Sequence, residues 1–176
     1  MIIIIEILLF VFLSIIAYQD IKSREVSWFL FPLVLIMIAA KGLFYEEAWQ
    51  LAGFFVINFL FLIIQLGVLF IFYAFRHKKF ENIINRKIGF GDLLFLIVLS
   101  AGFAPMFFEI FLTASFIVIL LAYVIWRSFS KPGANKTIPL AGGLASLYMI
   151  VLISGYFIPA INIYNNYLIE DLFIGK

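Results

Sequence analysis

The chain alternates long apolar runs with short polar segments. A membrane-spanning helix needs about 20 mainly apolar residues. We therefore predict six spanning helices, at Ile2–Tyr18, Trp28–Phe44, Ala48–Phe75, Asp92–Phe103, Met106–Trp126 and Ile138–Ile158. The fourth run is short, starts with a charge and ends at Gly102 and Pro105, residues that stop or kink helices. Its polar start is expected to be recessed into protein or water rather than lipid.

Composition agrees with this pattern. Of the 176 residues, 66% are apolar and 12% charged, and mean hydropathy is +1.18. In soluble domains about half of the residues are apolar and about a quarter are charged. The first run lacks the basic start and small-residue cleavage site of a signal peptide, so we expect it to stay as a span. The sequence thus predicts an all-α polytopic membrane protein with a single membrane-embedded domain, residues 1–176.

Basic residues gather on one side of the predicted layout, which the positive-inside rule assigns to the cytoplasm. Ten of the twelve lie after the first, third and fifth runs: Lys22, Arg24, Arg76, Lys78, Lys79, Arg86, Lys87, Arg127, Lys131 and Lys136. Glu46, Glu47 and Glu109 fall on the other side. We expect both termini outside, in a cytoplasmic (inner) cell membrane. A net charge of +2 is too small to indicate nucleic-acid binding.

Several kinds of chemistry are excluded. The chain has no cysteine and a single histidine, His77. It therefore lacks a catalytic thiol, a thiolate zinc site and the two histidines of an HExxH metalloprotease. No metal and no cofactor are expected, and nothing in the sequence sets the oligomeric state.

Two aspartates lie at the same predicted cytoplasmic boundary. Asp20 leaves the first run and Asp92 begins the fourth. Separately, Asp20 could be an interfacial helix end and Asp92 an N-cap residue. Together they fit an aspartic dyad, in which two close carboxylates share a proton, one activating water and the other polarising a peptide carbonyl. Gly89 and Gly91 would allow a sharp turn or a close helix approach beside Asp92.

These residues carry a resemblance. "YQDIKSREVSW" (Tyr18–Trp28) and "GFGD" (Gly89–Asp92) resemble the paired motifs of the GxGD aspartyl membrane proteases, specifically the type IV prepilin peptidase and archaeal preflagellin peptidase family. The resemblance implies a six-span peptidase core with Asp20 and Asp92 as catalytic residues. It also implies a membrane-bound prepilin-like or preflagellin-like precursor as substrate, cleaved at the cytoplasmic boundary.

The chain differs from that family in three respects. Leu94 stands where bacterial members usually have lysine, and Val26-Ser27-Trp28 stands where members often read Ile-Pro-Asn. The cysteine-rich methyltransferase domain of bifunctional members is missing, so N-methylation is not expected.

Three supporting positions have simpler explanations as well. Lys22 and Arg24 fit positive-inside anchoring. Pro139, in "KTIPLAGGLAS" (Lys136–Ser146), can start a helix whose small residues, Ala141, Gly142, Ala145 and Ser146, allow close packing. That segment also weakly resembles the family's last span, where it would form a wall of the substrate groove.

Two other functions remain open. A non-catalytic relative acting in membrane assembly would keep Asp20 and Asp92 for structure, and Leu94 favours this alternative. A small proton-coupled or cation-coupled transporter would also use membrane carboxylates, although both acids are predicted at one surface.

Overall fold

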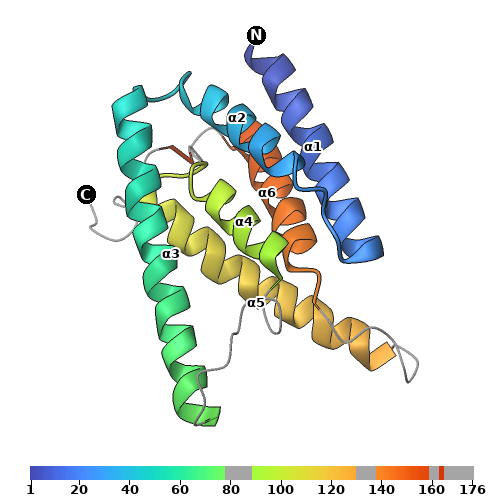
Figure 1. Ribbon diagram of the computed structural model, residues 1–176. Coiled ribbons are helices and arrows are strands. Elements are labelled where there is room, and N and C mark those ends of the chain that lie inside the picture. Colours follow the sequence, from blue (N-terminus) through green and yellow to red (C-terminus); the bar gives the residue numbers. More distant parts are fainter. Residues whose placement is uncertain (78–88, 130–137, 159–162, 165–176) are drawn as a thin grey trace.

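The computed structural model describes residues 1–77, 89–129, 138–158 and 163–164. Within these ranges the chain forms six α-helices and no β-strand, which confirms the predicted all-helical fold (Figure 1). The helices are α1 (Ile2–Ser23), α2 (Leu30–Gly42), α3 (Ala48–His77), α4 (Phe90–Leu99), α5 (Pro105–Phe129) and α6 (Leu140–Phe157). Six of the predicted cytoplasmic basic residues, at 78–87 and 131–136, lie outside the described residues.

Four of the six helices, α1, α3, α5 and α6, are long and apolar enough to cross a membrane. The other two are shorter than predicted. α2 has 13 residues and α4 has 10, which at 1.5 Å per residue gives about 20 and 15 Å, against a hydrocarbon core of about 30 Å.

The three tryptophans support a bilayer environment. Trp28 lies just before α2, Trp49 in the first turn of α3 and Trp126 in the last turn of α5. All three are exposed, Trp28 by 75% and Trp49 by 71%. Tryptophan at helix ends is typical of membrane–water interfaces, where the ring has one apolar and one hydrated side.

Helix boundaries near the two aspartates differ from the prediction. α1 continues to Ser23, five residues past Tyr18, so Asp20 belongs to its last turn instead of following it. α4 begins at Phe90 and ends at Leu99. Pro105 therefore does not end α4; it is the first residue of α5, a position that needs no backbone N–H.

α4 lies at the centre of the bundle. It contacts α2, α3 and α6, while α1 packs against α2 and α6, and α5 packs against α3 and α6 (Figure 1). Phe95 and Leu99 of α4 are fully buried, together with Leu13 of α1, Val34 of α2 and Tyr148 of α6. A helix too short to span a bilayer thus packs against three other helices.

The turn after α4 needs polar partners because it lies within the bundle. The side-chain amide of Asn58, fully buried on α3, donates to the carbonyls of Ser100 at 2.8 Å and Phe103 at 2.9 Å. The N–H of Ala104 donates to the carbonyl of Ile163 at 2.8 Å. Irregular backbone at membrane depth is tolerated when it is satisfied in this way.

Glu109 lies deeper than the predicted topology implied. Its Oε2 accepts a 2.6 Å hydrogen bond from Gln65, which is about 25 Å along α3 from Ala48 at the usual helical rise. α5 therefore begins beside the middle of α3, because the ten residues of α4 cover only part of the bundle's length.

Candidate active site

Asp20 is buried at the junction of α1 and α6. Only 6% of the residue is exposed. Its Oδ2 accepts a 2.6 Å hydrogen bond from the backbone N–H of Gly142, in the first turn of α6. Its own carbonyl accepts the N–H of Arg24, which closes α1. Asp20 is therefore fixed by both its side chain and its backbone.

Asp92 is the third residue of α4, and the N-cap is Gly89, so the expectation of an Asp92 N-cap is wrong. Its carboxylate reaches back to the backbone N–H of Gly89, as the acidic residue of a capping box does. It also reaches outward: Oδ1 accepts the N–H of Ala141 at 2.9 Å. Asp92 is half-buried.

The amino end of α6 brings the two aspartates together. Ala141 and Gly142 are consecutive residues whose N–H groups lie in the first turn, before the first i to i−4 hydrogen bond from Gly143 to Pro139. An N-cap side chain usually serves these donors, but Pro139, the N-cap here, has no acceptor in its side chain. Asp92 and Asp20, from two other helices, serve them instead, at the positive end of the helix dipole.

This arrangement limits the separation of the carboxylates. The backbone nitrogens of consecutive residues lie within about 4 Å of each other. Because Asp92 Oδ1 and Asp20 Oδ2 each accept a hydrogen bond from one of these two nitrogens, the two oxygens lie within about 10 Å of each other. The charge of Asp20 also acts on the Asp92 carboxylate. A single extended peptide could contact both.

The glycines at the site differ in how much they are needed. A Cβ on Gly142 would lie 3.1 Å from Asp20 Oδ2 and 3.2 Å from the Ala17 carbonyl, and one on Gly89 would lie 3.0 Å from Asp92 Oδ2. A Cβ on Gly91 would make only an ordinary 3.7 Å contact with Phe31. Gly89 has φ −65 and ψ 140, which any residue adopts. Of the two expected reasons for glycine, the backbone conformation of Gly89 does not require a sharp turn. Close approach explains Gly142 and Gly89 but not Gly91.

Lys22 and Arg24 take different positions. The Lys22 ammonium is directed to the hydroxyl of Tyr18 at 2.7 Å on the exposed side of α1. Arg24 is half-buried, and its charge acts on both Asp20 and Asp92. Leu94 is half-buried against the apolar core.

A second polar cluster, at the other end of α1, was not foreseen. Glu6 and Lys41 are 7% and 6% exposed, and their side chains form a 2.8 Å salt bridge. The hydroxyl of Tyr156 also donates to Glu6. This cluster ties α1, α2 and α6 together. The only sequence signal was a charge within each apolar run, since the pairing joins distant residues.

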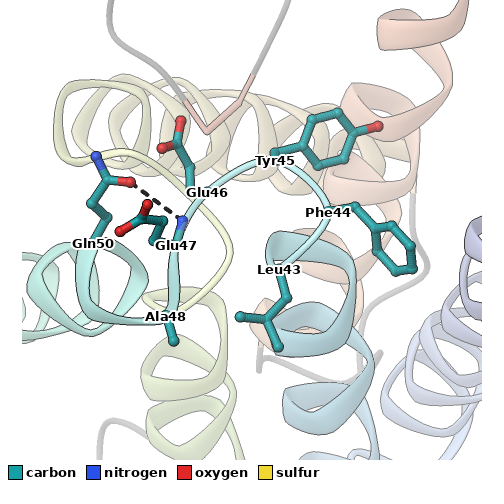
Figure 2. A pocket seen from close by; sticks show the side chains of 7 residues that line it. All are labelled: Leu43, Phe44, Tyr45, Glu46, Glu47, Ala48 and Gln50. Atoms are coloured by element: carbon teal, nitrogen blue, oxygen red, sulfur yellow. Dashed lines mark hydrogen bonds between the residues drawn. The ribbon is translucent and has the colours of Figure 1, made fainter.

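A pocket of about 450 Å³ lies between α2 and α3, at the opposite end of the bundle from the aspartates. Figure 2 shows its lining: Leu43, Phe44, Tyr45, Glu46, Glu47, Ala48 and Gln50. Two of its polar side chains form hydrogen bonds at the start of α3. Gln50 accepts the N–H of Glu47 at 3.3 Å (Figure 2), and Glu47 accepts the indole N–H of Trp49 at 2.6 Å. We therefore place the candidate chemistry at the aspartates.

In the ranges that the structure describes, no three metal-ligating side chains come together. Comparison of the chain with family models, with curated proteins and with solved structures found no match. Residue chemistry and geometry therefore carry the functional argument.

Proposed function

We propose that this chain is a membrane aspartic endopeptidase of the GxGD type, with Asp20 and Asp92 as its catalytic pair. One observation carries the proposal: carboxylates from α1 and α4 converge on consecutive N–H groups of α6. A carboxylate in a membrane helix is costly, and two at one site favour a functional role. The motifs around them, Tyr18–Trp28 and Gly89–Asp92, resemble those of prepilin and preflagellin peptidases.

Peptide hydrolysis needs one ionised and one protonated member of the pair. As water attacks the carbonyl carbon, the ionised member takes a water proton and the protonated member gives its proton to the carbonyl oxygen. When the C–N bond breaks, one hydroxyl proton of the diol returns to the second carboxylate, and the first gives its proton to the leaving nitrogen. The hydrogen bonds to Ala141 and Gly142 engage one oxygen of each carboxylate.

The substrate we propose is a prepilin-like or preflagellin-like membrane precursor, cut where its basic leader meets its apolar helix. This requires the aspartate end of the bundle to face the cytoplasm. The basic residues Lys22, Arg24 and Arg127 belong to the positive-inside set that supports this orientation.

A non-catalytic assembly role is the second candidate, and the same hydrogen bonds give it a specific basis. Both aspartates already act as caps for α6, which is what a purely structural role requires. Asparagine is also a good capping residue, so substitution by asparagine separates the two proposals.

The test is co-expression with a prepilin-like precursor, followed by its size on a gel, for the wild type, Asp20→Asn and Asp92→Asn at equal membrane abundance. We expect the wild type to shorten the precursor and both variants to leave it intact. Cleavage that survives either substitution would rule out the aspartic mechanism. Correct folding of all three proteins without cleavage would favour the assembly role.

A further inference from the structure

Arg24 has an unusual backbone conformation. It follows the last residue of α1 with φ 60 and ψ 20, in the left-handed region, and it is the one non-glycine residue with positive φ in the described ranges. Glycine is the usual residue at this position after a helix, because a Cβ is strained there. A strained residue that persists beside a candidate site calls for a reason involving its side chain.

The guanidinium of Arg24 offers such a reason. Its Nη1 is buried and has no hydrogen-bond partner among the residues that the structure describes. Its positive charge acts on both Asp20 and Asp92, although its side chain makes no salt bridge to either within the described part of the chain. A buried donor without a partner costs free energy and is uncommon in folded proteins. Arg24 thus holds an unused, permanently charged donor at the end of α1, next to Asp20, whose carbonyl accepts the Arg24 N–H.

We infer that Arg24 is a further substrate-contacting residue, which donates a hydrogen bond from Nη1 to the oxygen of the peptide carbonyl that is hydrolysed. This inference rests on the proposed endopeptidase function. That oxygen carries partial negative charge in the transition state, while the proton is still moving to it from the protonated aspartate, and a hydrogen bond from a fixed donor then stabilises the transition state more than the ground state. Arginine keeps its proton at any physiological pH, so Arg24 forms no covalent bond and transfers no proton.

Lys22 provides a matched control, because it carries the same charge two residues earlier. Its side chain is exposed and directed toward Tyr18. If Arg24 served only to anchor the helix end at the cytoplasmic surface, loss of either charge would have a similar effect. If Arg24 contacts substrate, only its own loss would matter.

Arg24→Gly separates activity from folding. Glycine relieves the positive-φ strain while removing the guanidinium, so this variant should fold and unfold at no lower temperature than the wild type. We expect kcat for cleavage of a purified prepilin-like precursor to fall about 10²- to 10³-fold, the size of effect seen when one such donor is removed, with little change in KM. Arg24→Lys should recover part of kcat, and Lys22→Gln should cleave at the wild-type rate.

Two outcomes would overturn the inference while leaving the endopeptidase intact. One is an Arg24→Gly variant that cleaves with wild-type kcat; the other is a Lys22→Gln variant that loses as much as Arg24→Gly. Arg24→Asn, which also tolerates the left-handed conformation, should repeat the loss if the guanidinium matters. Failure of the folded wild type to cleave any precursor would instead contradict the proposed function, and the inference with it.

Discussion

At the scale of single residues, the site depends on how closely α6 approaches α1. Gly142 allows its N–H to reach Asp20 at 2.6 Å, and the space that its Cβ would need is occupied by Asp20 and the Ala17 carbonyl. Ala17, Ala141 and Ala145 are also buried, as expected where helix backbones come close together. Small residues thus determine whether the carboxylate meets its donor.

Gly142→Ala should therefore disturb both folding and cleavage. Its Cβ would lie 3.1–3.2 Å from Asp20 and from backbone, so α6 must move, at a cost of about 1–3 kcal/mol. Thermal unfolding in detergent and precursor cleavage measure the two effects.

Gly91→Ala is the matched control. Its Cβ meets only Phe31 at 3.7 Å, and alanine is up to about 1 kcal/mol more favourable than glycine within a helix. We expect unchanged or higher stability. Greater damage from Gly91→Ala than from Gly142→Ala would contradict the close-approach argument.

At the scale of helices, polar side chains hold the short elements in place. Asn58 fixes the turn after α4 through two hydrogen bonds, and the Glu6–Lys41 salt bridge with Tyr156 joins three helices at the other end. Both contacts lie within otherwise apolar surroundings. Their loss would leave buried polar groups without partners, which costs more than the loss of a surface contact.

Asn58→Ala should destabilise the fold by about 2 kcal/mol or more, because the carbonyls of Ser100 and Phe103 lose a buried donor. Ile57→Ala, at the neighbouring exposed position of α3, should have a much smaller effect. Equal unfolding temperatures for these two variants would show that the turn does not need Asn58.

Lys41→Met should destabilise the protein by about 3 kcal/mol or more, because Glu6 would stay buried without its cation. The double variant Glu6→Leu/Lys41→Met should be more stable than Lys41→Met alone, since apolar pairs often replace buried ion pairs at little cost. Denaturation of the single and double variants measures the difference. A double variant that is no more stable than Lys41→Met would show that the two side chains are not coupled.

The helical pattern of the chain was largely predictable, because apolar runs and their polar breaks are local features. The short fourth helix, for example, follows from the polar start at Gly89–Asp92 and the break near Gly102. The predicted start of this helix, Asp92, lies two residues after its actual start at Phe90. The predicted end, Phe103, lies four residues after its actual end at Leu99, because the turn begins already at Ser100.

The geometry of the site was not predictable in the same way. The two aspartates could be singled out because charge is rare in apolar runs. Their shared partners could not: backbone N–H groups carry no sequence signature, and Gly142 is distant from both Asp20 and Asp92 in the chain. The same holds for Glu6 and Lys41, which only the packing of α1 against α2 brings together.

For the complete helical bundle, cleavage at the cytoplasmic boundary requires one orientation in the membrane. The aspartates lie at the end of the bundle where α1 ends and α4 and α6 begin, and the α2–α3 connection lies at the other end (Figure 1). The endopeptidase needs the first of these ends in the cytoplasm.

Orientation can be measured directly because the chain has no cysteine of its own. We expect Ser23→Cys, exposed at the aspartate end, to react with a membrane-impermeant maleimide only in permeabilised cells. Glu47→Cys, exposed at the other end, should react in intact cells. The reverse pattern would place the aspartates outside and contradict the proposed substrate.

The most direct test of the central claim is the rate at which the purified protein cleaves a prepilin-like precursor, compared with Asp20→Asn and Asp92→Asn. Asparagine can still accept the α6 N–H groups but cannot take up or release the proton that hydrolysis needs. We predict that both variants unfold near the wild-type temperature and cleave at least about 10³-fold more slowly. A folded Asp20→Asn or Asp92→Asn variant that cleaves at the wild-type rate would show that the two carboxylates serve the structure and not the chemistry.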